Sequence, residues 1–189
     1  RGISLSLPSI KPKTYIGRLS SLLATIKKTG LTFAPEAASV RLRKILSKEF
    51  NIEDFFQAIE QAYIAGYQHI KLYFMIGLPH EELKDLDDII EFVSQVSQLR
   101  RKIKRSAAGV NISVNALIPK PHTPFQWLKT EDIDIIRDKQ NYLKKKIIKN
   151  KKLKLSFHNS KMAFLEGVLS RGDRRLSQVI SSAFKRGAR

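Results

Sequence analysis

The chain of 189 residues is 42% hydrophobic and 8% aromatic, which is enough apolar material for a packed core and excludes an intrinsically disordered segment. Lys and Arg total 35 against 17 Asp and Glu, and the net charge of +18 either attracts polyanions such as nucleic acid or is spread over solvated helix faces. Because there is no cysteine and no apolar run near roughly 18 residues, disulfides, thiolate metal sites and a transmembrane helix are excluded.

Short apolar runs alternate with helical patterns along the chain, which predicts βαβ units and a parallel sheet. We expect, in order, a strand over 3–7, a helix over 15–28, a strand over 31–34, helices over 40–46 and 52–65, a strand over 70–76, a helix starting within 81–88, a strand over 110–118, a helix over 130–149, a strand over 153–157 and a helical segment over 161–188. Asn51 is the expected cap of the helix over 52–65, and Gly66 is expected to end it.

The run over 70–76 is nearly continuous in apolar residues, which is typical of a strand buried on both faces of a parallel sheet. Right-handed crossovers place the carboxyl ends of all the strands on one side of the sheet, and that rim is where ligands bind in open sheets and barrels. Loops rich in Pro or Gly follow the predicted strands there: Pro8-Ser9, Pro35-Glu36, Gly77-Leu78-Pro79 and Pro119-Lys120-Pro121.

Three segments carry a family resemblance by their order and spacing. They are LTFAPEAASVRLRKILSK over 31–48, YFMIGLP over 73–79 and IPKPHTP over 118–124. They resemble the fourth, fifth and sixth strands of the barrel of radical S-adenosylmethionine (SAM) enzymes. Three further segments extend the resemblance: SLPS over 6–9, PFQW over 124–127 and RGDRR over 171–175. With them, the chain is similar to a subfamily of large radical enzymes that have a cobalamin-binding-like amino-terminal region.

The resemblance implies an α/β fold in which residues 1–128 form the carboxyl-terminal part of a TIM-like (β/α) barrel and residues 129–189 a basic, mostly helical extension. It also implies that the first two strands and the loop with three cysteines are missing. Since the chain opens on Arg1 and not on Met, we expect a fragment. A fragment would leave the strand edge near 3–7 unpaired.

The implied activity is that of an enzyme in which a [4Fe–4S] cluster reduces SAM to a 5′-deoxyadenosyl radical, which abstracts hydrogen from a substrate of unknown identity. Cobalamin is a further cofactor expected in the full-length protein. This chain alone would be inactive, would partner the missing amino-terminal half and would lie in the cytoplasm. The catalytic residues are not identified by the resemblance, and we expect no metal ligand within this chain. A further expected partner is tRNA or another nucleic acid.

By position, the resemblance makes Arg41 and Lys48 candidates for binding the methionine carboxylate of SAM, against the alternative that both are solvated. Arg43 and Lys44 nearby are expected to lie on the surface. Glu36 either accepts hydrogen bonds from the ribose or the methionine ammonium, or clamps the loop around it.

Tyr73 stands where many relatives of this kind carry an acid that binds ribose; its hydroxyl could do the same, or its ring could pack inside the barrel. Gly77 is expected to matter for backbone shape. The resemblance also implies that the backbone N–H and C=O groups near Ala116 to Ile118 face the adenine. The basic segment 171–175 could contact nucleic acid, dock on the missing half or form a structural network. The competing function is a basic α/β RNA-binding module without catalysis, and a third is a scaffold derived from such an enzyme.

Overall fold

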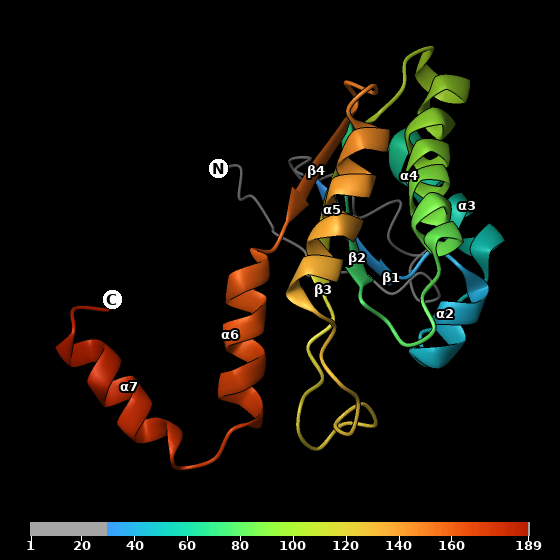
Figure 1. The fold of residues 1–189 in the computed structure, drawn as a ribbon. Coiled ribbons are helices and arrows are strands. Elements are labelled where there is room, and N and C mark those ends of the chain that lie inside the picture. The colour runs from blue at the N-terminus through green and yellow to red at the C-terminus, as the bar shows by residue number, and fades with distance from the viewer. Residues whose placement is uncertain (1–29, 189) are drawn as a thin grey trace, which may run out of the picture.

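The structure is a computed structural model that describes residues 30–188 and shows an α/β fold with four parallel strands. The strands lie side by side in chain order: β1 (Leu31–Glu36), β2 (His69–Ile76), β3 (Gly109–Ala116) and β4 (Leu153–Phe157) (Figure 1). The helices are α2 (Val40–Ile45), α3 (Ile52–Ile64), α4 (Leu83–Lys104), α5 (Ile133–Ile147), α6 (Ser160–Arg171) and α7 (Leu176–Lys185). The predicted alternation is confirmed from residue 31 onward, and the elements expected over 3–7 and 15–28 lie outside the described residues.

Local signals in the sequence account for the helix ends. The Asn51 side chain accepts a hydrogen bond from the Asp54 N–H at 2.9 Å, and this confirms the predicted cap of α3. Gly66 follows α3 with a φ of 95°, a conformation that favours glycine. At the start of α4, Glu82 and Asp85 form a reciprocal capping box.

Helices α3, α4 and α5 cover one face of the sheet (Figure 1), and the core lies between them and the strands. The buried strand positions alternate along β2 and β3, as expected for side chains that point to one face. An aromatic group ties the layers together, because Phe92 of α4 contacts Phe55 of α3 and Phe74 of β2 with ring centroids 5.1 and 5.7 Å apart. Each such fully buried side chain stabilises the fold by about 1.5–3 kcal/mol.

The other face of the sheet is polar, which corrects the expectation that the run over 70–76 is buried on both faces. Along β2, buried residues alternate with half-buried ones, and Lys71 and Tyr73 stand on the less buried face. The strand register continues this face in two rows across the sheet, Thr32–Lys71–Asn111–Lys154 and Tyr73–Ser113–Ser156. The apolar content of the run misleads because Tyr73 and Met75 count as hydrophobic residues although they are only half-buried, with Met75 packed against the small apolar cluster around Leu42.

Beyond β4 the chain leaves the sheet. The sheet itself continues past residue 128 through α5 and β4, whereas α6 and α7 extend away from its carboxyl end (Figure 1). No residue of α7 is buried, and both helices carry large exposed apolar side chains. Within the described residues, no helix is long and apolar enough to cross a membrane.

Candidate functional site

The carboxyl ends of the four parallel strands lie at one rim, and α2 packs across part of it. Leu42 of α2 is buried together with Ala37 and Leu78, which follow β1 and β2. A register shift near the end of β1 brings the strand out of step with β2 just before this helix. The rim is therefore built from the same loops that carry the predicted site residues.

Glu36 and Lys48 meet at this rim. Glu36 is the last residue of β1, has a φ of 65° and is largely buried, and its Oε1 lies 3.7 Å from Lys48 Nζ. Burial raises the pKa of the Glu36 carboxyl, and the nearby ammonium of Lys48 opposes that rise. Since 53% of the Lys48 side chain is exposed, the two opposite charges form a loose pair that is open to solvent on the lysine side.

Arg41 is bound to another part of the protein. Its guanidinium donates to Asp85 Oδ2 at 2.6 Å and to the His80 carbonyl at 2.8 Å. Asp85 also closes the capping box of α4 by accepting the Glu82 N–H at 2.7 Å. Arg41 therefore joins α2 to the start of α4.

Arg43 is buried, so the expectation that it lies on the surface is wrong. Its guanidinium stacks 4.5 Å from the centre of the Phe50 ring and donates to the Ala38 carbonyl. The cation is held by a backbone acceptor and an aromatic face, which the run of basic residues did not reveal. Lys44 is exposed, as expected.

A buried carboxylate organises the loop after β2. Gly77 has a φ of 77°, and its N–H donates to Glu81 Oε2 at 2.9 Å. Lys139 of α5 donates to the same oxygen at 2.6 Å and lies 3.4 Å from Glu131. Glu81 Oε1 is buried without a hydrogen-bond partner among the described residues, and burial raises the pKa of this carboxyl against the opposing effect of Lys139.

The remaining predicted positions, at Tyr73 and near Ile118, form no side-chain hydrogen bond or ion pair with Glu36 or Lys48 among the described residues. Tyr73 stands half-buried on the polar sheet face, with Lys71 Nζ 4.6 Å from the centre of its ring. The Leu117 N–H donates to the Ile76 carbonyl at 2.8 Å, so this donor is used within the sheet. The Ile118 side chain packs toward α6, close to Gly167.

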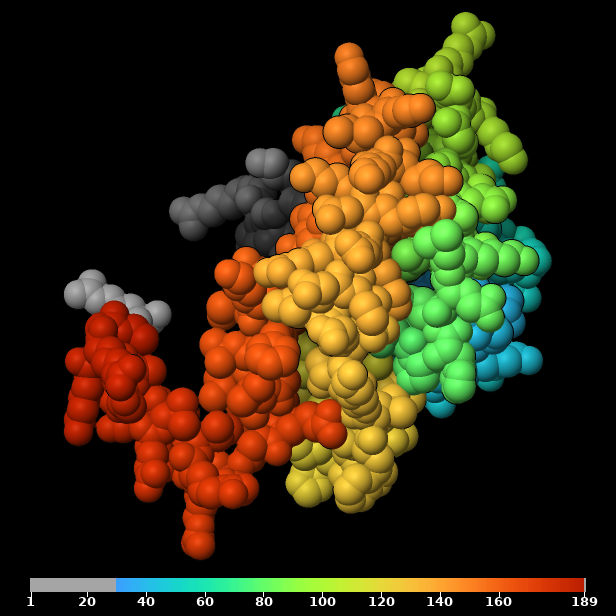
Figure 2. Space-filling view, in the orientation of Figure 1, coloured from blue at the N-terminus to red at the C-terminus, as the bar shows by residue number. Residues whose placement is uncertain are grey.

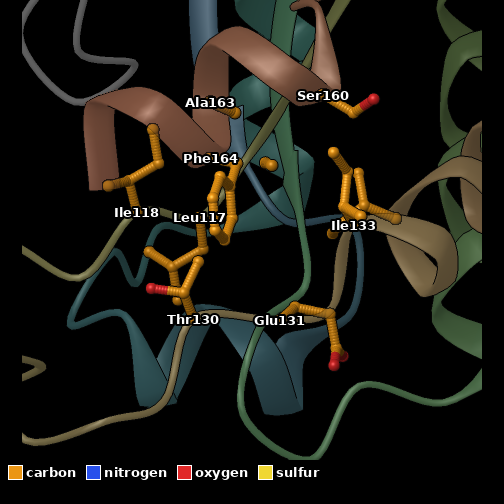
Figure 3. Close-up of a pocket in the computed structure, with 10 residues that line it drawn as sticks. Leu117, Ile118, Thr130, Glu131, Ile133, Ser160, Ala163 and Phe164 are labelled. Atoms are coloured by element: carbon orange, nitrogen blue, oxygen red, sulfur yellow. The ribbon is translucent and has the colours of Figure 1, made fainter. Parts of the chain in front are cut away.

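Two cavities lie near these residues. Figure 3 shows the first, where Ile118 and Leu117 face Phe164 of α6, and it has a volume of about 10 Å³. Such a cavity holds a single water molecule at most. The second, of about 200 Å³, lies between the loop 77–80 and residues 128–131 at the rim. It is smaller than a typical ligand pocket but is bordered by polar groups.

The basic segment 171–175 forms a structural network. Arg171 donates to the carbonyls of Leu128 at 2.7 Å and Gln126 at 3.1 Å, which ties the end of α6 to the loop before α5. Arg175 pairs with Asp173 at 2.8 Å.

The chain is similar to a longer protein of Methanocaldococcus jannaschii. That protein, named Uncharacterized protein MJ0966, is 33% identical to it over 179 residues. The alignment covers 95% of this chain and 37% of the relative, so the chain spans little more than a third of the relative's length. No protein-family model matches the chain, and no solved structure matches it.

Of the six predicted site residues, Glu36 and Lys48 lie together, and Arg41 pairs with Asp85. Tyr73 precedes Phe74, the register partner of Glu36, while the Gly77 N–H is bound to Glu81 and Ile118 packs toward α6. The contact between Glu81 and Lys139 was not foreseen, because 58 residues separate its partners and nothing in the sequence near Lys139 marks it. Glu81 itself had a signal, since it lies two residues after the Gly77-Leu78-Pro79 turn.

Proposed function

We propose that this chain is part of the barrel of a radical SAM enzyme and that it contributes to the SAM cradle. The observation that carries the proposal is the pair of opposite charges, Glu36 and Lys48, at the carboxyl rim of a parallel sheet. Ligands bind at this rim in parallel α/β folds.

The polar sheet face supports a barrel. Parallel sheets normally bury both faces under helices, but here α3, α4 and α5 cover one face and the other carries Lys71, Tyr73 and Asn111. In a (β/α) barrel the second face points to the interior and is lined by side chains of alternate strands. The rows across the strands place polar side chains on this second face, which suits a face that is not covered by helices.

The charges at the rim fit the amino-acid end of SAM. Its methionine part carries an ammonium and a carboxylate, and Glu36 and Lys48 offer the complementary carboxylate and ammonium side by side. When SAM and a reduced iron–sulfur cluster are bound, they supply the radical chemistry. Within this account Lys48 orients the carboxylate of SAM, Glu36 accepts hydrogen bonds from its ammonium, and Arg41 holds the rim together through Asp85.

The cluster itself does not fit this chain. The sequence has no cysteine, and the described residues contain no group of three or more His, Asp and Glu side chains that could hold a metal ion. The proposal therefore requires the three-cysteine loop to come from sequence outside these 189 residues. Cobalamin, as a further cofactor of the full-length protein, would also be bound by sequence outside these residues.

Titration calorimetry of SAM against the full-length protein, with its cluster reconstituted without oxygen, tests the role of the pair. A charge-assisted hydrogen bond at a half-exposed site is worth about 1–2 kcal/mol, so Lys48→Gln is expected to weaken SAM binding about 5- to 30-fold. Lys44→Gln is the matched control, because Lys44 is an exposed cation on the adjacent helix. Equal affinities for the two variants, or no SAM binding by the parent protein, would refute the assignment.

A further inference from the structure

Charge is distributed unequally between the two ends of the sheet. Acidic residues gather after the strands and in the first turns of the helices, as in 81–91 and 131–138. The sequence then has no Asp or Glu over 92–130 or over 139–165. These two stretches contain the ends of α4 and α5 and the loops that lead into β3 and β4, which is the end of the sheet opposite the candidate site.

Ten cations gather at this opposite end, five from the end of α4 and five from the end of α5 and its loop. We call this set the basic edge, and it consists of Arg100, Arg101, Lys102, Lys104, Arg105, Lys144, Lys145, Lys149, Lys151 and Lys152. All except Arg100 are exposed. No described carboxylate lies within 4 Å of any of them, whereas neighbouring Lys146 is paired with Asp87 at 3.6 Å and is left out of the set.

Helix dipoles explain only part of the basic edge. Cations in the last turn of a helix interact favourably with its negative end, and this accounts for Arg101, Lys102 and Lys104 in α4. It accounts equally for Lys144 and Lys145 in α5. Arg105 is the C-cap of α4, but Lys149, Lys151 and Lys152 lie beyond the C-cap of α5, where the effect of the dipole falls off.

The two halves of the basic edge are held next to one another. The Val110 N–H at the start of β3 donates to the Lys152 carbonyl at 2.9 Å, and Val110 pairs with Leu153 in the sheet. The loops before β3 and β4 therefore lie side by side. In Figure 2, long side chains project at one end of the molecule. They come from the yellow-green end of α4 and from the orange region around the end of α5.

We infer that the basic edge binds the phosphate backbone of a nucleic acid. A row of exposed lysines and arginines without carboxylates matches closely spaced phosphates, and release of their counterions drives such binding. An anionic membrane is a poorer match, because stable attachment to a bilayer needs apolar side chains as well as charge. Around the basic edge, Ile148 is the one large apolar residue of the described loops that is strongly exposed.

The position of the basic edge assigns it a docking role. Helix α4 alone has 22 residues, about 33 Å at 1.5 Å per residue, and it separates the basic edge from the rim with Glu36 and Lys48. A nucleic acid bound there anchors the protein and does not enter the candidate site. The inference is therefore independent of the proposed SAM chemistry, and either can fail alone.

Fluorescence anisotropy with labelled duplex RNA, duplex DNA and single-stranded RNA tests the inference on the full-length protein. The variant carries Arg105→Gln, Lys149→Gln, Lys151→Gln and Lys152→Gln, and the control carries Lys44→Gln, Lys84→Gln, Lys129→Gln and Lys161→Gln. Both remove the same charge from exposed positions. Between about 50 and 200 mM salt, the edge variant should lose at least about tenfold in affinity, and its log–log salt slope should flatten by about 2–4.

The control variant should bind within about threefold of the parent protein. Equal losses in the two variants would show that only net charge matters and would overturn the inference, as would the absence of binding to all three nucleic acids. Phosphatidylserine vesicles form a fourth arm; edge-dependent binding to vesicles alone would also overturn it. A smaller variant, Lys151→Glu with Lys152→Glu, repeats the test should the fourfold variant fold poorly.

Discussion

Arg41 and Lys48 are two exposed cations seven positions apart, yet their partners give them different roles. Arg41 donates to Asp85, whose side chain is 6% exposed and also caps α4. Lys48 makes one contact of 3.7 Å with Glu36. The first contact is short and shielded on the acceptor side, and the second is long and solvated, so only the first should contribute much to stability.

Substitution of each residue should separate these roles. Arg41→Gln is expected to lower the free energy of unfolding by about 1–2 kcal/mol, because Asp85 loses a charged donor, whereas Lys48→Gln should lower it by about 0.5 kcal/mol or less. Urea denaturation followed by circular dichroism measures both. A larger loss for Lys48→Gln than for Arg41→Gln would contradict the assignment of Arg41 to structure.

Glu81 is the residue whose protonation should couple to stability. Burial raises the pKa of its carboxyl above the ordinary value of 4.5, so the folded state binds this proton more tightly than the unfolded state does. Its contribution is thus fully present below pH 4.5 and is lost as the pH rises through the raised value. The Glu81→Gln variant has no ionisable carboxyl at this position, so it lacks this pH-dependent contribution.

The free energy of unfolding of the parent protein, relative to Glu81→Gln, should therefore be greatest near pH 4 and fall toward pH 7. Subtracting the free energy of unfolding of the variant from that of the parent protein removes the effect of the other carboxyls, which titrate in both proteins. Urea denaturation at several pH values gives the difference. A difference that rises with pH would mean that Lys139 outweighs burial in setting the pKa of Glu81.

Among the elements, the turn between β2 and α4 is the most constrained. Gly77 has a positive φ of 77°, and a Cβ added there would lie 2.8 Å from Ile136 Cδ1 and 3.2 Å from Glu131 Cβ. Gly167 lies inside α6, where an added Cβ would make ordinary contacts of 3.7 Å. The same substitution should therefore have opposite effects at the two positions.

Gly77→Ala is expected to destabilise the protein by about 1–3 kcal/mol through strain at a left-handed backbone position. Gly167→Ala should stabilise it by about 0.5–1 kcal/mol, because alanine loses less entropy in a helix. Thermal or urea denaturation of both variants checks this. If Gly77→Ala were neutral, the turn would not be held in the conformation that the Glu81 contact requires.

The elements were predictable where a local signal exists. Strand 153–157 matches β4 at both ends, and the cap at Asn51 is confirmed, because each depends on neighbouring residues. The burial of Arg43 and the contact between Glu81 and Lys139 were not predictable, since each depends on side chains brought together by the sheet. The polar face of β2 was missed because Tyr73 and Met75 resemble core residues in composition and differ from them only in facing.

At the scale of the whole molecule, the two faces of the sheet differ: one is covered by helices and the other is polar. Helices α3, α4 and α5 bury the first, and the second presents Lys71, Asn111 and Lys154 in a row. Acidic residues concentrate toward the rim, whereas the opposite end carries the basic edge in stretches without Asp or Glu. This division suits a small charged ligand at the rim and a polyanion at the other end.

The central claim is that the rim binds SAM for radical chemistry, and reductive cleavage of SAM by the full-length protein tests it most directly. The protein is reconstituted with iron and sulfide without oxygen, reduced with dithionite and assayed for 5′-deoxyadenosine by chromatography. The account predicts 5′-deoxyadenosine in the parent protein and a clear loss in Lys48→Gln but not in Lys44→Gln. A reconstituted, reduced protein that binds a cluster yet releases no 5′-deoxyadenosine would contradict it.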